Sequence, residues 1–233
     1  MNSNITVERQ SIARSAVSTR QKKIIYAGTF DPPHWGHFKS PLFIKREIGA
    51  DELIYVPFSE HEVKQWQASS FFYRARMLQV YLYTLDIPSM KLCLEEGFRE
   101  GVNYTVDIIK DVVGQDKEED VEWYFLVGED KLFLLDIMRD FEHILELISG
   151  FLVMCCPTCG RGKGYWENNF PPYLNEGNCI LFDNPECPHI SSKDIRQTLH
   201  HGRYDDEEVK TLLHPDVLQC IENHDLYYYR KML

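Results

Sequence analysis

Apolar runs of strand length alternate with longer segments of helical spacing over most of this chain. Strands are predicted at residues 23–27, 53–56, 91–94, 123–127, 151–155 and 179–182. Helices are predicted over residues 36–48, 71–85, 104–113 and 130–147. Strands that are apolar throughout and separated by helices form parallel sheets covered on both faces. The pattern therefore predicts an α/β fold with a doubly wound parallel sheet.

The amino-terminal 21 residues carry a different pattern. Residues 1–21 lack periodic apolar spacing and are rich in Ser and Arg, which is typical of a flexible leader. An organelle transit peptide is the alternative, because such peptides are also rich in Arg and Ser and poor in acids. We expect residues 22–233 to form a single domain.

The carboxyl-terminal third combines a long loop with helices. Residues 156–178 are rich in Gly, Pro and Asn and are predicted to be a loop. A Ser191–Ser192 cap and a His214–Pro215 pair then predict helix starts, so that a helical part begins at about residue 190. The Tyr227–Tyr229 run is predicted to pack on the body as a helix end rather than to stack on bases.

Composition and charge restrict the possible partners. The chain has 233 residues, a formal net charge of −11 and a sequence pI near 5.3. Binding to a nucleic-acid polymer depends on clustered Lys and Arg, so no such partner is expected. No stretch approaches the roughly 18 apolar residues that span a membrane, and no membrane contact is expected. A pocket for small anions is still compatible with an acidic surface.

The cysteines indicate a reducing compartment. The chain has seven, an odd number, and no apolar secretory leader, which favours free thiols and a cytoplasmic location. A zinc site is the sharper alternative for one group of them, although the spacing is irregular. That group comprises Cys155, Cys156, Cys159, Cys179, Cys187 and His189.

The turn after the first predicted strand has the chemistry of a phosphate site. It reads GTFDPPHWGH from Gly28 to His37. Ligands of open parallel sheets bind beyond the carboxyl ends of the strands, and a helix start there directs N–H groups at an anion. His34 and His37 are three residues apart, so that both can reach one polyphosphate.

These residues resemble the first signature of the HxGH nucleotidyltransferases, in particular the nicotinate/nicotinamide mononucleotide adenylyltransferases. The second signature of that family, ISSTxIR, is matched by Ile190–Arg196. Three intermediate marks follow in order: an RxxML-like helix at Arg74–Leu78, a YTxDT-like stretch at Asn103–Asp107 and a GxD at Gly128–Asp130. The resemblance extends from about Lys22 to Tyr228 and implies a Rossmann-like sheet with C-terminal helices.

The resemblance also implies the reaction. A mononucleotide 5′-phosphate would attack the α-phosphorus of ATP and release pyrophosphate, with Mg²⁺ carried mostly by phosphate oxygens and water. The catalytic residues would be His34, His37 and Arg196. ATP would bind to Gly28, Thr29, Phe30, His34, His37, Gly128, Asp130, Ile190, Ser191, Ser192 and Arg196.

The pyridine mononucleotide would contact a second group of residues. By the same resemblance these are Lys64, Tyr104, Thr105 and Met138. Ordinary roles remain open for three of the implied residues: Asp130 as a helix cap, Thr105 as a first-turn residue and Lys64 as a solvated side chain. No protein-bound metal is implied.

Three positions depart from the family pattern. Lys193 replaces the Thr of ISSTxIR, and we expect the enzyme to stay active with this replacement. Met138 stands where the family often has a ring-stacking Trp, so the choice between nicotinate and nicotinamide stays open. Cys156–Thr158 replaces an Arg-Pro-Gly and removes a guanidinium.

We expect the nicotinate mononucleotide to be the acceptor, with nicotinamide mononucleotide as a variant of that prediction. The alternatives are another HxGH adenylyltransferase, such as a phosphopantetheine adenylyltransferase, and a non-catalytic nucleotide-binding module. An oligomer is compatible with the sequence but is not specified by it.

Overall fold

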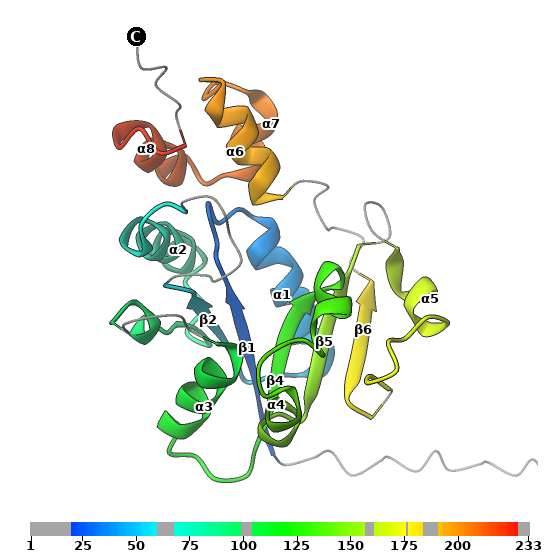
Figure 1. Cartoon of the computed structure of the whole chain (residues 1–233). Coiled ribbons are helices and arrows are strands. Elements are labelled where there is room, and N and C mark those ends of the chain that lie inside the picture. The colour runs from blue at the N-terminus through cyan, green and yellow to red at the C-terminus, as the bar shows by residue number, and fades with distance from the viewer. Residues whose placement is uncertain are drawn as a thin grey trace, which may run out of the picture.

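The fold is a parallel sheet with helices on both faces and a helical part at the carboxyl end (Figure 1). The computed structural model describes residues 20–59, 68–98, 104–156, 161–175, 177–183 and 191–227. Its strands are β1 Gln21–Gly28, β2 Glu52–Pro57, β3 Met90–Leu92, β4 Val121–Gly128, β5 Gly150–Cys155 and β6 Cys179–Asp183. Its α-helices are α1 Gly36–Ile48, α2 Phe71–Leu85, α3 Thr105–Gln115, α4 Phe141–Leu147, α5 Gly162–Glu167, α6 Ser192–His200, α7 Glu207–Leu212 and α8 Pro215–Asn223. Two 3₁₀ helices, η1 Glu95–Phe98 and η2 Glu129–Leu134, follow β3 and β4.

The strand order places the loops that follow β1 and β4 side by side at the carboxyl ends of the central strands. The order is β3-β2-β1-β4-β5-β6 and every described pairing is parallel. The order reverses between β1 and β4, and such a reversal is where ligands bind in open α/β sheets. The loops that leave β1 and β4 therefore flank the expected binding crevice, and the prediction of a Rossmann-like doubly wound sheet is confirmed.

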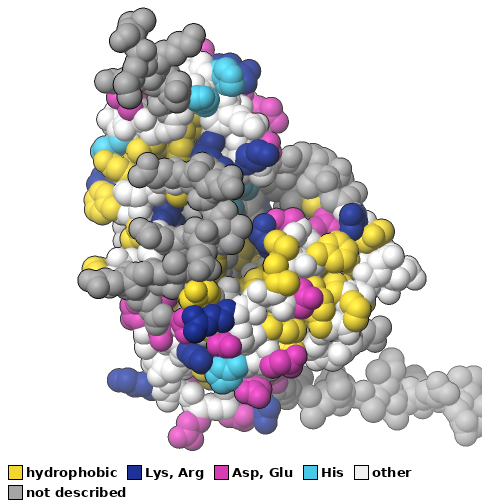
Figure 2. Space-filling model, in the orientation of Figure 1, with side chains coloured by type: hydrophobic (Ala, Val, Ile, Leu, Met, Phe, Trp, Pro, Cys, Tyr) yellow, Lys and Arg dark blue, Asp and Glu magenta, His cyan; other side chains and the backbone are white. Residues whose placement is uncertain are grey.

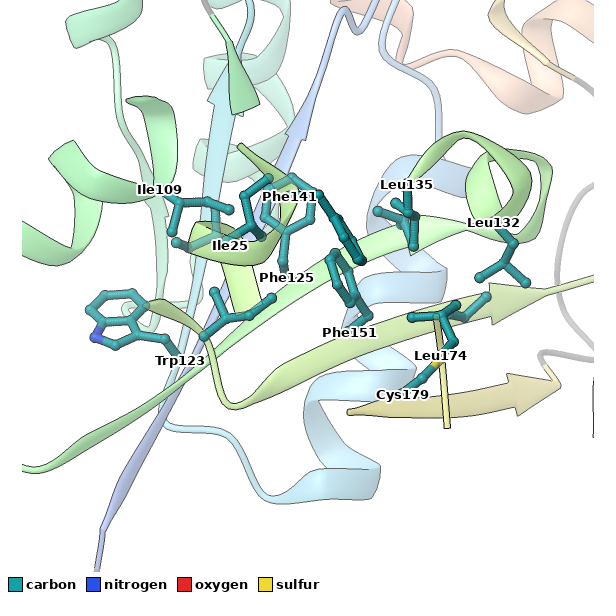
Figure 3. Close-up of a cluster of buried hydrophobic side chains, with 14 of the residues drawn as sticks. Ile25, Ile109, Trp123, Phe125, Leu132, Leu135, Phe141, Phe151, Leu174 and Cys179 are labelled. Carbon is teal, nitrogen blue, oxygen red and sulfur yellow. The ribbon is translucent and has the colours of Figure 1, made fainter. Parts of the chain in front are cut away.

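Neighbouring residues of β1 face opposite layers of the core. Ile25 belongs to a cluster with Phe125, Phe151 and residues of α3 and α4, ten of whose side chains are labelled in Figure 3. Ile24 and Tyr26 belong to the other cluster, with residues of α1, α2 and the C-terminal helices. Side chains alternate across a strand, so the consecutive apolar residues 24–27 of β1 require cover on both faces.

The C-terminal helices are tied to the loop that follows β1. The Trp35 N–H donates to the Leu212 carbonyl at 2.9 Å. The Tyr81 hydroxyl lies 3.4 Å from the Pro33 carbonyl and accepts the His214 N–H at 2.9 Å. In Figure 1, α6, α7 and α8 lie above the carboxyl ends of the strands. The helical part therefore covers the crevice side of the sheet.

Several predicted elements differ from the structure. The strand expected at 91–94 ends at Leu92, because η1 starts three residues later. The helical stretch expected at 130–147 is divided into η2 and α4, and Asp140 between them has a left-handed φ of 53°. The loop expected at 156–178 contains α5, whose Trp166 is 2% exposed. Its glycines hide the helical signal, and tertiary burial of the indole stabilises the turn.

The acidic run that starts at Asp116 is more than a solvated surface. Lys23 is 3% exposed, and its Nζ lies 2.6 Å from Asp116 and 2.8 Å from Glu118. Burial lowers the pKa of Lys23, but its bonds to these carboxylates outweigh this and leave the pKa raised. Asp116 and Glu118 therefore balance the charge of a buried lysine.

No helix in the described ranges is long and apolar enough to cross a membrane. The first strand begins at Gln21, beside the domain boundary expected at residue 22. The expected leader lies almost wholly outside the described residues, and the single-domain division stays a prediction.

Candidate active site

The loop between β1 and α1 folds back on its own first residue. Phe30 has a left-handed φ of 49° and is 3% exposed. A Cβ placed on Gly28 would lie 3.2 Å from the Phe30 ring, which is tighter than an ordinary contact. The lack of a side chain at Gly28 therefore leaves room for the Phe30 ring, whereas the phosphate contacts of Gly28, Thr29 and Phe30 stay predictions.

The two histidines of the first signature lie against each other. Their ring centroids are 3.9 Å apart. The His34 N–H donates to Nδ1 of His37 at 3.1 Å, and the Gly36 N–H donates to Nδ1 of His34 at 3.2 Å. Because each Nδ1 accepts a hydrogen bond, each neutral ring carries its own proton on Nε2. The pair therefore offers two Nε2–H donors at the start of α1.

Burial keeps both rings neutral. It lowers the pKa of His34 to about 4, and the ring is 6% exposed. Burial, followed by repulsion from His34, lowers the pKa of His37 well below its usual value. At neutral pH the pair therefore donates hydrogen bonds without carrying charge.

The neutral state of His34 predicts a pH-dependent stability. Its pKa is about 4 in the folded chain against about 6.5 when unfolded, so the unfolded state binds the proton first as the pH falls. The free energy of unfolding should fall between about pH 6.5 and 4, by roughly 2 to 3 kcal/mol for this group. Urea unfolding of the wild type and of His34→Gln at pH 7.5 and 4.5 measures it. The difference between the two proteins should change with pH; a constant difference would contradict a buried neutral ring.

The start of α6 meets the loop that carries the histidines. The Ser192 hydroxyl donates to the Pro32 carbonyl at 2.9 Å, and Nη1 of Arg196 donates to the Asp31 carbonyl. Burial lowers the pKa of Arg196, and the charge of Asp31 opposes that shift. The two signatures, about 160 residues apart in sequence, therefore lie side by side, and their contact with one triphosphate stays a prediction.

Ser191 is engaged in a capping box. Its hydroxyl lies 3.3 Å from the Asp194 N–H, and its own N–H donates to the Asp194 carboxylate at 3.0 Å. These bonds from Ser191 lower the pKa of Asp194. The predicted cap is confirmed, and the phosphate contact predicted for Ser191 stays a prediction.

A cavity of about 590 Å³ opens beside α6. It is lined by Ala68, Ser69, Lys193, Arg196, Gln197, His200, Asp225, Leu226 and Tyr227. Dark-blue Lys and Arg atoms lie along the lower edge of the C-terminal helical part, where it meets the rest of the molecule (Figure 2). The space next to Arg196 can therefore admit a ligand, and Lys193 adds a second cation to its wall.

Arg74 stabilises the loop between β1 and α1 by hydrogen bonds to backbone carbonyls, a role that the sequence did not reveal. It is 1% exposed. Its guanidinium donates to the carbonyls of Thr29 at 2.7 Å, Ser59 at 2.9 Å and Ser69 at 2.9 Å. The RxxML-like spacing marked Arg74 only as part of a resemblance, and no local pattern announces its three carbonyl partners.

The loop after β4 contains one structural and one exposed acid. Oε2 of Glu129 accepts the Trp166 indole N–H at 2.7 Å and the Gly162 N–H at 3.2 Å, and Oε1 accepts the Cys156 N–H at 2.9 Å. Asp130 has 68% of its side chain exposed and lies 2.5 Å from Lys131. Glu129 thus anchors α5 to β5, while the ATP contact implied for Asp130 and Gly128 stays a prediction.

Replacing Glu129 should destabilise the fold. In Glu129→Ala, several amide and indole donors lose their acceptor, at a cost of roughly 2 to 3 kcal/mol. The melting temperature should fall by roughly 5 to 10 °C for a chain of this size. Thermal unfolding measures it, with Asp130→Ala as the matched control that should melt within about 2 °C of the wild type. Equal melting of all three proteins would show that Glu129 carries no such role.

The predicted pyridine residues lie at the start of α3 and beyond η2. Tyr104 precedes α3, and Thr105 is its first residue. Met138 packs partly buried against the same core cluster as Tyr104. Arg139, next to Met138, places its guanidinium carbon 4.4 Å from the centroid of the Tyr104 ring. The two segments are therefore neighbours, and their contact with a mononucleotide stays a prediction. Lys64 and Ile190 lie outside the described residues.

The cysteines give no support to zinc within the described part of the chain. No group of three or more His, Cys, Asp or Glu residues there could hold a metal ion. Cys155 and Cys179 are buried free thiols, and burial raises the pKa of each to about 12. Cys156 is disulfide-bonded, so the expectation of reduced thiols throughout is wrong at that position. Cys159, Cys187 and His189 lie outside the described residues.

Comparison with known proteins agrees with this geometry. A family model described as cytidylyltransferase-like matches residues 25–198, which places the chain among the nucleotidyltransferases of that family. The chain is 30% identical over 213 residues to a probable nicotinate-nucleotide adenylyltransferase of Thermoanaerobacter sp. (strain X514), covering 87% of this chain and 92% of the relative. It is 28% identical over 204 residues to a probable nicotinate-nucleotide adenylyltransferase of Oceanobacillus iheyensis, covering 87% and 95% of the two chains.

A solved structure supports the same fold. The nicotinic acid mononucleotide adenylyltransferase of Plasmodium falciparum, in complex with NaAD, superposes with a TM-score of 0.72 at 20% identity and covers 89% of this chain and 98% of its own. The chain belongs to the nicotinate-nucleotide adenylyltransferase family.

Proposed function

We propose that this enzyme transfers the adenylyl group of ATP to nicotinate mononucleotide, giving the dinucleotide and pyrophosphate. The observation that carries the proposal is the meeting of the two histidines with Ser192 and Arg196 across one loop. The names of the relatives support the pyridine mononucleotide as acceptor rather than phosphopantetheine.

The proposed mechanism depends on positioning and charge. The mononucleotide phosphate attacks the α-phosphorus, and the bond to the β-phosphate oxygen breaks as pyrophosphate leaves. The Nε2–H groups of His34 and His37 donate to phosphate oxygens as charge moves onto the leaving group. Arg196 supplies a fixed cation for the pyrophosphate. No covalent intermediate with the protein is required.

Mg²⁺ is proposed to enter with ATP. The site offers N–H donors and a guanidinium, and the described residues form no carboxylate cluster that would hold the ion. These residues therefore fit an ion held by phosphate oxygens and water, where it neutralises the polyphosphate. The cytoplasmic location and an oligomeric assembly stay predictions.

One substrate comparison tests the proposal. Pyrophosphate release is measured with ATP and Mg²⁺ and with nicotinate mononucleotide, nicotinamide mononucleotide or phosphopantetheine in turn. We expect the highest kcat/KM with nicotinate mononucleotide. A preference for phosphopantetheine, or tight ATP binding without turnover on any acceptor, would contradict the proposal.

A further inference from the structure

The carboxylate of Asp31 is enclosed by hydrogen-bond donors from two distant segments. Asp31 is 1% exposed. Its Oδ1 accepts the Ser69 hydroxyl at 2.5 Å and the Tyr227 hydroxyl at 2.6 Å, and its Oδ2 accepts the Ser69 N–H at 3.4 Å. A buried carboxylate needs such donors, because an unpaired one would carry a large desolvation cost. Tyr227 is therefore part of the support of the loop between β1 and α1.

The chain bends sharply after α8 to bring Tyr227 to this place. Asp225 and Tyr227 have left-handed φ values of 50° and 66°. Such backbone is strained where the residue is not glycine, so surrounding contacts must hold it. The Tyr227 ring packs against the core cluster on the α1 side of the sheet, and its hydroxyl also lies 3.2 Å from that of Ser69. The tail is thus held by its contacts with the loop.

Asp31 connects this tail to the proposed catalytic groups. Its backbone carbonyl accepts a hydrogen bond from Nη1 of Arg196, while its carboxylate accepts one from the Tyr227 hydroxyl. The charge of Asp31 also raises the pKa of Arg196 against the effect of burial. A shift of Asp31 would therefore move the guanidinium and the loop that leads to His34.

We propose that Tyr227 is a positioning residue for the triphosphate site, acting through Asp31 on Arg196. The inference rests on the proposed function and adds the C-terminal tail to its machinery. Tyr227 touches no reacting atom; its hydroxyl fixes the carboxylate, and the carboxylate fixes the loop.

The test is Tyr227→Phe, which removes one hydroxyl and keeps the ring. A hydrogen bond to a charged group contributes about 1.5 to 3 kcal/mol, so we expect kcat/KM for ATP to fall about tenfold or more. The KM for the mononucleotide should stay within about twofold. Tyr73→Phe is the matched control: its ring lies 4.7 Å from that of His224, beside the same tail, and should leave both constants unchanged.

Asp31→Asn tests whether Tyr227 acts through the carboxylate. Tyr227→Phe should cost less than about twofold further in that background, because residues that act as one unit are not additive. A Tyr227→Phe protein with a lower melting temperature but unchanged kinetic constants would overturn the inference, since a merely structural bond gives that result. An equal change in the KM of both substrates would also overturn it.

Binding separates this inference from the proposed function. The affinity for a non-hydrolysable ATP analogue with Mg²⁺, measured by calorimetry, should fall about tenfold in Tyr227→Phe and not in Tyr73→Phe. If the wild type binds the analogue but turns over no pyridine mononucleotide, the proposed function fails. The ratio of the affinities of wild type and Tyr227→Phe for the analogue still decides the inference. Equal affinities of wild type and Tyr227→Phe, or no binding by the wild type, would overturn the inference.

Discussion

His37→Ala should lower kcat by about two orders of magnitude or more, the scale of losing a preorganised donor in the transition state. The His37 ring accepts the His34 N–H on Nδ1, so its Nε2–H is the group left to meet a phosphate oxygen. Steady-state pyrophosphate release measures the effect. Because the donor forms its bond mainly as charge develops, KM for ATP should change much less than kcat.

Two further variants make this result specific. His37→Gln keeps an N–H donor near the position of Nε2 and should retain more activity than His37→Ala. His201→Ala removes an exposed histidine whose Nδ1 lies 2.7 Å from the Gln197 carbonyl, and the variant should match the wild type. Wild-type rates for His37→Ala would remove His37 from the mechanism.

Arg196→Ala should have an effect of comparable size, with a rise in KM for ATP as well as a fall in kcat. The guanidinium donates to the Asp31 carbonyl in the loop between β1 and α1, and it lines the cavity beside α6, where a phosphate can reach it. Arg196→Lys keeps the positive charge but lacks the planar guanidinium, so its kcat and its KM for ATP should lie between those of the wild type and of Arg196→Ala.

Arg203→Ala is the control for the general loss of an arginine from the C-terminal part. Its side chain is 58% exposed and lies 3.9 Å from Asp206. It should leave both kinetic constants unchanged. If Arg196→Ala and Arg203→Ala behaved alike, the role proposed for Arg196 would be wrong.

The strongly periodic part of the fold was predictable from sequence. The predicted ranges 36–48 and 71–85 coincide with α1 and α2, because long amphipathic segments bounded by Gly49 and by serines leave few alternatives. Ser70 directly precedes α2, but its side chain makes no cap bond, and the neighbouring Ser69 hydroxyl donates to Asp31.

Elements that depend on tertiary partners were not predictable. Helix α5 has only six residues and two of the first four are glycines, so its stability comes from Glu129 and from burial of Trp166. The division of residues 130–147 at Asp140 likewise depends on a left-handed residue that propensity disfavours.

The site divides in the same way. Local motifs identified His34, His37 and Arg196 as candidate site residues, because a phosphate site needs hydrogen-bond donors and cations at helix starts. The support of the loop stayed hidden, because Asp31 and Tyr227 are 196 positions apart. The first signature contains Asp31 and the C-terminal tyrosine run contains Tyr227, but neither pattern indicates that the two side chains meet. The GxD pattern also drew attention to the exposed Asp130, whereas Glu129 holds the local structure together.

A crystal structure with a non-hydrolysable ATP analogue and Mg²⁺ would show whether the two signatures bind the same triphosphate. We expect one triphosphate that contacts Nε2 of His34 or His37 on one side and Arg196 or the first turn of α6 on the other. A triphosphate bound to only one of these two groups, or in a separate cavity from either, would contradict it.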